Sequence, residues 1–107
     1  MISLEALINR LRNLLSEETV PSSGGTLQMT VTSTPTPLGS QKCRMVTIKS
    51  DSGNADSVYV GFSSDLSATN GFPIAPGEYI DIVVNDLSKV YVMSPSDGQK
   101  IYVMWVR

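Results

Sequence analysis

The sequence contains no histidine, and this absence removes much of the chemistry that small enzymes use. Histidine is the usual general base near neutral pH, the usual activator of a serine or cysteine nucleophile, and the commonest zinc ligand. The single cysteine, Cys43, excludes a disulfide within the chain, so packing or contacts between chains must stabilise the fold. We therefore expect no enzyme and no cofactor, and a fold suited to a reducing cytoplasm.

Basic residues are few and scattered, since the 107-residue chain has eight Lys and Arg against ten Asp and Glu and a pI near 4.9. No positive stripe predicts a polyanion partner, so we expect no nucleic acid to bind. No apolar run approaches the roughly 20 residues that span a bilayer. Glu5, Arg10 and Arg12 also interrupt the apolar N-terminal segment. We expect neither membrane insertion nor export.

The spacing of the apolar residues changes once along the chain, between residues 19 and 26. Before this point leucines recur at steps of three and four, which predicts a helix, and after it apolar and polar residues alternate as in strands. The intervening segment combines a proline with Ser and Gly residues, which is typical of a linker. We expect a helix over residues 1–16, a flexible linker over 17–26 and a β domain over 27–107.

The predicted helix is amphipathic, and Ser3 stands where an N-cap belongs. A helix of about 14 residues is marginal alone in water, so its leucine face must be covered. Two interpretations stay open. The helix packs on the β domain of its own chain, or it associates with other chains, because the leucines also fit the a and d positions of two heptads. The residues expected to contact another chain or a scaffold are Leu4, Leu7, Ile8, Leu11, Leu14 and Leu15.

The rest of the chain predicts about six short strands separated by turns rich in Gly, Pro, Asn and Asp. The prolines place residues 34–39 in a loop or an edge strand. Residues 90–93 and 101–106 predict a terminal hairpin, apolar at nearly every position, whose second face something must cover. The pattern indicates a mainly β fold, a small antiparallel β-sandwich or barrel of jelly-roll type. The residues expected on the inner faces of the first three strands are Leu27, Met29, Val31, Val46, Ile48, Val58, Val60 and Phe62.

Cys43 is a possible reactive group. Lys42 and Arg44 flank it, and their charges favour a lowered thiol pKa. With no histidine to serve as its base, a nucleophilic role has little support, and a small buried residue at the start of a strand explains it better.

Two groups of acidic residues have the chemistry of possible sites. Asp51, Asn54 and Asp56 could supply oxygen ligands to calcium, but their spacing lacks the order of an EF-hand loop and fits a turn better. Glu78 and Asp81 could form an acid-base pair for glycoside hydrolysis, but strand alternation sends them to opposite faces. We expect no metal site and no catalytic residues.

The loop over residues 65–76 is the segment expected to face outward or meet a neighbouring copy, because it is polar and ends in a proline-bracketed turn. Phe72 suits two roles equally, plugging the end of the barrel or touching a partner. We expect Trp105 to be a core anchor and the four tyrosines to lie on strand faces opposite the core. The candidate partner contacts are Asp65, Asn70, Phe72 and Ile74.

The order of motifs resembles the small β-domains of tailed-bacteriophage virion proteins. The resemblance covers roughly residues 26–107 and rests on Val58-Tyr-Val-Gly61, Gly71-x-Pro-Ile-x-Pro-Gly-Glu78, an Asp-Leu-Ser turn, and Val90-Tyr-Val before a closing apolar strand. It implies a head-decoration, head-fibre or adaptor protein, made in the host cytoplasm and resident in the virion. The implied partners are further copies of the chain, with a trimer favoured, and the major capsid or another virion protein. No catalytic residues are implied. A carbohydrate- or receptor-binding module at a fibre or tail tip is the alternative, and a glycan receptor would then be a partner.

Overall fold

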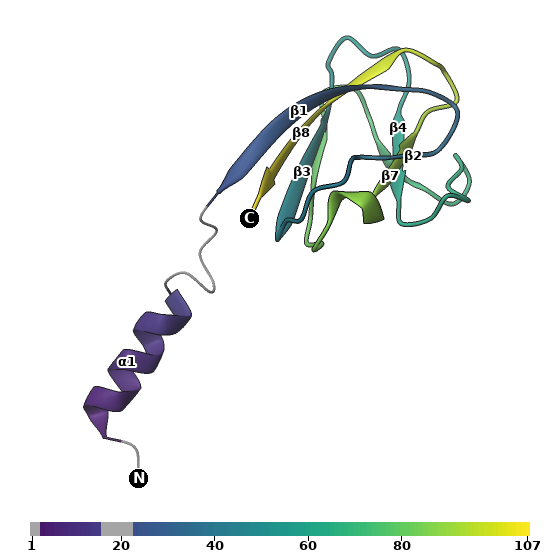
Figure 1. Ribbon diagram of the computed structural model, residues 1–107. Helices are drawn as coiled ribbons and strands as arrows, with labels where there is room; N and C mark the ends of the chain where they lie inside the picture. Colours follow the sequence, from purple (N-terminus) through teal and green to yellow (C-terminus); the bar gives the residue numbers. More distant parts are fainter. Residues whose placement is uncertain (1–2, 16–22) are drawn as a thin grey trace.

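The computed structural model describes residues 3–15 and 23–107 (Figure 1). They form one α-helix, eight β-strands and a turn of 3-10 helix. The elements are α1 (Leu4–Leu15), β1 (Gly24–Val31), β2 (Thr36–Pro37), β3 (Met45–Ser50), β4 (Val58–Gly61), β5 (Phe72–Ile74), β6 (Tyr79–Ile82), η1 (Leu87–Lys89), β7 (Tyr91–Met93) and β8 (Gln99–Val106).

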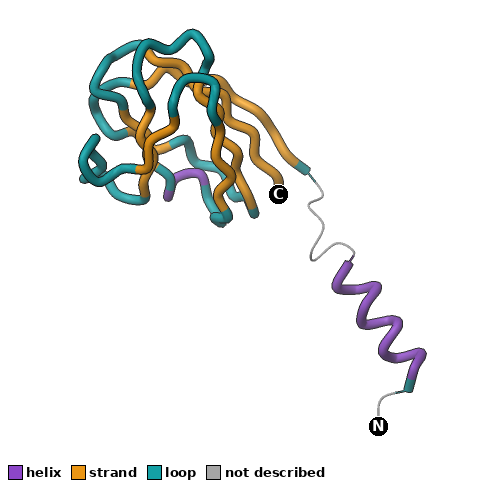
Figure 2. Tube along the Cα trace, turned by 180° about the vertical axis from the view of Figure 1, so that it is seen from behind, coloured by secondary structure: helices purple, strands orange, loops and turns teal. Residues whose placement is uncertain are grey.

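The strands form two antiparallel four-stranded sheets that pack against each other (Figures 1 and 2). Sheet A has the order β1-β8-β3-β6, and sheet B has the order β2-β7-β4-β5. Successive strands lie in opposite sheets except for β4 and β5, which pair with each other. This is the strand order of a jelly roll. The predicted mainly β sandwich is confirmed, with two more strands than expected because β2 and β5 are very short.

The predicted terminal hairpin is wrong. β7 pairs with β2 and β4 in sheet B, whereas β8 pairs with β1 and β3 in sheet A, so the loop between them crosses from one sheet to the other. β8 alternates, with Ile101 and Val103 buried, while Tyr102 and Met104 are exposed on the outer face of sheet A. Two apolar runs around a turn predict strands but do not say which strands pair.

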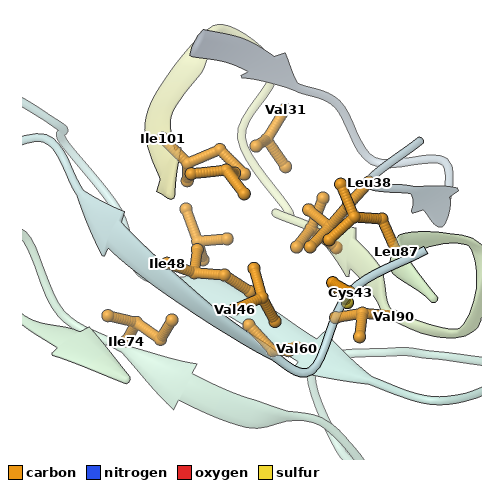
Figure 3. Packing of buried hydrophobic residues seen from close by; sticks show 13 residues of the cluster. Val31, Leu38, Cys43, Val46, Ile48, Val60, Ile74, Leu87, Val90 and Ile101 are labelled. Carbon is orange, nitrogen blue, oxygen red and sulfur yellow. The ribbon is translucent and has the colours of Figure 1, made fainter. Parts of the chain in front are cut away.

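The core lies between the sheets and is built mainly from alternate strand residues (Figure 3). Val46 and Ile48 of β3 and Val58 and Val60 of β4 are buried, as predicted. Burial of each such side chain contributes roughly 1.5–3 kcal/mol. Residues outside the long strands complete the cluster, whose members are Val31, Leu38, Cys43, Val46, Ile48, Val58, Val60, Ile74, Leu87, Val90, Val92, Ile101 and Val103.

Two expectations about strand ends need correction. Phe62 does not belong to the core, because β4 ends at Gly61 and the Phe62 side chain is 66% exposed. β1 begins at Gly24, within the segment expected to be linker. Gly25 lies so close to the ring of Trp105 that a Cβ atom there would be 2.5 Å from it. The glycine is therefore a strand residue that makes room for the indole, which packs partly against the core as predicted.

The prediction that residues 34–39 form a loop or an edge strand is confirmed. β2 lies at the edge of sheet B. Pro37 has no backbone N–H, and a sheet edge tolerates this because no inner strand is interrupted. Leu38, which follows it, donates its backbone N–H to Val90 O at 2.9 Å and buries its side chain. The edge segment thus closes one side of the core.

Candidate functional site

The N-terminal helix begins at a polar cap. The Ser3 side-chain oxygen accepts a hydrogen bond from the Ala6 backbone N–H at 3.1 Å, and the Ser3 carbonyl accepts one from the Leu7 N–H at 3.1 Å. These bonds satisfy two of the donors that a helix leaves open at its start. The predicted N-cap is confirmed.

The same helix carries an exposed apolar face. Leu4, Leu7 and Ile8 are 73%, 47% and 41% exposed. Figures 1 and 2 show α1 set apart from both sheets. The backbone of α1 also includes the positions of Leu11, Leu14 and Leu15, but their side chains lie outside the described residues. Contact of this face with another chain stays a prediction.

The loop between β4 and β5 is organised around one buried leucine that the sequence reading missed. Leu66 is 6% exposed, and its Cδ1 atom lies between Gly61 and Gly71. A Cβ atom would be 2.7 Å from it at Gly61 and 2.8 Å from it at Gly71. The two glycines at the loop ends therefore create the space that the leucine fills.

Two of the predicted partner contacts hold this loop together. Asn70 donates its amide to the Asp65 carbonyl at 3.0 Å and accepts from the Ser67 N–H at 2.7 Å. The amide of Asn70 is thus occupied inside the loop, while the Asp65 side chain is exposed. Such side-chain to backbone bonds fix a loop in one shape.

The other two predicted contacts differ from each other. Phe72 is 59% exposed at the start of β5, so the barrel-plug interpretation does not describe it. Ile74 is 2% exposed and belongs to the core, opposite Val58 in the β4–β5 pair, so its assignment as a partner contact is wrong. Phe62 is exposed at the other end of the loop. Two exposed aromatic rings therefore flank one ordered loop.

The outer face of sheet A contains a groove of about 540 Å³ that was not predicted. Its walls include Tyr102 and Met104 of β8, both exposed, and Lys49 of β3. Tyr102 donates its hydroxyl to Asp51 at 3.0 Å, which restricts the orientation of the ring in the groove wall. The remaining lining residues are Thr26, Leu27, Gln28, Thr47 and Val103. This lining offers hydrogen bonds and apolar contact, and contains no acid-base pair.

The pKa of the Cys43 thiol is shifted in the direction opposite to the one that its charged neighbours suggest. It is buried in the core, and its thiol donates to the Val84 carbonyl at 3.2 Å. Burial, and after it the charge of Asp86, raise the pKa of the Cys43 thiol. The expectation that Lys42 and Arg44 lower this pKa is wrong, because burial and the negative charge of Asp86 shift it the other way.

The acidic turn after β3 uses its polar atoms for internal bonds. An Asp51 carboxylate oxygen accepts from the Gly53 N–H at 3.2 Å. Asp56 accepts from the Ser57 N–H at 2.8 Å and from the Ser96 hydroxyl at 3.0 Å. These bonds explain the residues as turn chemistry. Over residues 3–15 and 23–107, no three His, Cys, Asp or Glu residues lie close enough to hold a metal ion.

Glu78 and Asp81 have separate structural partners. Glu78 accepts from the Ala75 N–H at 2.9 Å and closes the turn in which Gly77 has a φ of +84°. Asp81 accepts a hydrogen bond from the Thr47 hydroxyl across the β3–β6 pair. Each carboxylate therefore stabilises a different local structure.

These observations define a small jelly-roll domain preceded by an amphipathic helix. No known protein family and no curated protein matches the sequence. Among solved structures, the chain is similar to a protein of Bacillus endospore appendages, which form a novel family of disulfide-linked pili. The match has 13% sequence identity and a TM-score of 0.47, and covers 78% of this chain and 85% of the other. In the part of the chain that the structure describes, no helix has the length and apolar character needed to cross a membrane.

Proposed function

We propose that this protein is a non-enzymatic structural component of a bacteriophage virion, associated with the capsid as a decoration, fibre or adaptor protein. The observation that carries the proposal is the exposed leucine face of α1, with Leu4 the most exposed of its described members. A helix of 12 residues gains little stability by itself in water, so its apolar face favours a partner. The proposed partner is α1 of further copies, in a symmetric oligomer with a trimer favoured.

Two further observations support a virion rather than another assembly. The motif order from Val58 to the C-terminal strand resembles tailed-phage β-domains. Jelly rolls are also used by viral capsid domains, although fold alone does not determine function. The proposal therefore rests on the helix for assembly and on the resemblance for the virion.

Light scattering of the full chain tests the assembly. The wild-type chain should have a mass that is a multiple of three chains of 11.5 kDa. Leu7→Glu places a charge on the exposed apolar face and should abolish the threefold association. Asn9→Glu adds the same charge to the polar face of α1 and should leave the mass unchanged. A wild-type chain whose mass equals that of Leu7→Glu at every concentration overturns the proposal.

The virion location needs its own test. Mass spectrometry of purified particles of the phage that encodes the chain should detect it in many copies per particle. A chain that is expressed during infection but absent from the particles contradicts the virion assignment, and would leave the oligomer untouched.

A second candidate function, binding of a carbohydrate receptor, is favoured by one specific observation. Phe62 and Phe72 are both exposed and flank the ordered loop, and exposed aromatic rings are suited to stack on sugars. Phe72→Ala should then abolish binding on a glycan array. Tyr79→Ala removes a ring that is 67% exposed on sheet A and should leave binding intact. Equal binding by both variants, or none by the wild type, contradicts this candidate.

A further inference from the structure

The four sheet edges of the sandwich differ in how they are protected. β2 and β5 have two and three residues and contain Pro37 and Pro73, while β6 has four residues and contains Asp81. Short strands, proline and charge are the usual devices that prevent an edge from pairing with another chain. β1 has eight residues, GGTLQMTV, with neither proline nor charge. One edge is therefore long and unprotected.

The hydrogen-bond pattern identifies which groups of β1 point outward. Ser23 and Arg107 exchange both backbone bonds, at 3.1 and 2.6 Å. In an antiparallel ladder every second residue repeats this arrangement, so Gly25, Leu27 and Met29 bond to β8. β1 is the first strand of sheet A, and the described part of the chain places no strand beyond it. The residues whose N–H and C=O groups point away from the sheet are Gly24, Thr26, Gln28 and Thr30.

We propose that β1 pairs with β1 of a second copy of this chain, antiparallel and across a twofold axis, to make one continuous eight-stranded sheet. The absence of charge in β1 favours this occupant, because self-pairing then brings no like charges together. Leu27 and Met29 are only partly buried at the open edge, and the added strand covers them further. This interface is separate from α1 and goes beyond the proposed function.

The register follows from the outward groups. If all four outward-pointing residues of both copies form backbone hydrogen bonds, Gly24 must lie opposite Thr30 and Thr26 opposite Gln28. The twofold axis then passes at Leu27. This arrangement forms about eight hydrogen bonds between the copies. It places Leu27 of each copy side by side on the inner face and Thr26 beside Gln28 of the second copy on the outer face.

A charge exchange across this register tests the interface. The full chain carrying Leu4→Glu and Leu7→Glu, which removes association through α1, should be a dimer at high concentration. Adding Thr26→Lys and Gln28→Lys places like charges opposite each other and should weaken the dimer at least tenfold. Adding Thr26→Glu and Gln28→Lys places opposite charges there and should retain it. Equal association of the two charged variants, or a monomeric parent chain, overturns the proposal, with circular dichroism verifying that each variant is folded.

Cross-linking gives a readout that association through α1 cannot produce. Residues that face each other at Leu27 would form a pair without backbone hydrogen bonds, with Cα atoms about 4.5 Å apart, which suits a disulfide. In a chain with Cys43→Ala, Leu27→Cys should cross-link two copies under oxidation, whereas Met29→Cys should not. Equal cross-linking at both positions, or none at Leu27→Cys, contradicts the register. The cross-linking test does not depend on the proposed trimer. If α1 does not associate, the wild-type chain should itself be a dimer through β1, and the expected cross-linking is the same.

Discussion

The side-chain amide of Asn54 pairs with both main-chain groups of Lys100. Its Nδ2 donates to the Lys100 carbonyl at 2.8 Å, and its Oδ1 accepts from the Lys100 N–H at 2.8 Å. Nδ2 also donates to the Ser50 hydroxyl at 2.9 Å. The amide thus behaves as a strand residue beside the start of β8 at the point where β3 ends, and it connects the acidic turn to the two inner strands of sheet A.

Asn54→Asp should destabilise the protein by about 1–3 kcal/mol, because a carboxylate cannot donate to the Lys100 carbonyl. The carboxylate would also face that carbonyl oxygen without a proton between them. Urea unfolding of both proteins measures the difference. Asn85→Asp makes the same chemical change at an exposed side chain and should alter stability by less than about 0.5 kcal/mol. Equal effects at the two positions would contradict the role of the Asn54 amide.

The packing of Leu66 against Gly61 predicts a strong coupling between these residues. Gly61→Ala should cost about 1–3 kcal/mol, because the added Cβ atom meets the Leu66 Cδ1 at 2.7 Å. Leu66→Ala should cost about 2–5 kcal/mol by leaving a cavity. In the double variant the clash is gone, so its cost should fall below the sum of the two by about 1 kcal/mol or more.

Gly71 supplies the control for this cycle. A Cβ atom there meets the Tyr59 Cβ at 2.8 Å and the Ser67 carbonyl oxygen at 2.9 Å as well as Leu66. Leu66→Ala should therefore relieve little of the cost of Gly71→Ala. Additive effects in both pairs, measured by thermal or urea unfolding, would show that Leu66 does not organise the loop.

Local patterns predicted the strands well, because burial on one face requires alternation. Val46 and Ile48 illustrate this, as both are fully buried at alternate positions. Strand pairing was not predictable in the same way. The apolar runs of β7 and β8 flank a short turn, yet they belong to different sheets, and only their distant partners decide this.

The sequence predicted only part of the candidate site, again because strand pairing decides which residues are exposed. Phe72 and Ile74 lie two residues apart in one short segment, and the sequence makes both candidates for contact with a partner. Pairing with β4 instead buries Ile74 opposite Val58 and leaves Phe72 exposed at the sheet edge. Leu66 was overlooked because it stands alone in a polar loop, although the glycines at both loop ends were a signal of close packing.

Cys43 should make the protein less stable in alkali. Its pKa is raised in the folded state by burial and by Asp86, so it contributes stability below its ordinary value of 9.0 that is lost as the pH rises through the folded value. The free energy of unfolding should therefore fall more steeply above pH 9 in the wild type than in Cys43→Ala. Tyr102 acts in the same direction, because its hydrogen bond to Asp51 raises its pKa, but both proteins contain Tyr102, so its contribution cancels in this comparison. Identical pH profiles of wild type and Cys43→Ala would contradict the burial of the thiol.

Asp86 should have the opposite effect in acid. Its carboxylate caps η1 by accepting from the Ser88 N–H at 2.9 Å, and its pKa is lowered by hydrogen bonds from Ser88, then by Gln41 and the charge of Lys89. A lowered pKa contributes stability that is present above the ordinary value of 3.8 and is lost as the pH falls through the folded value. Asp86→Asn keeps a capping oxygen without the charge, so its unfolding free energy should change less than that of the wild type between pH 5 and pH 2. Asp86→Ala removes the cap and should be less stable than Asp86→Asn across this whole range. If wild type and Asp86→Asn lose stability in parallel on acidification, the charge of Asp86 does not stabilise the turn that leads into β7.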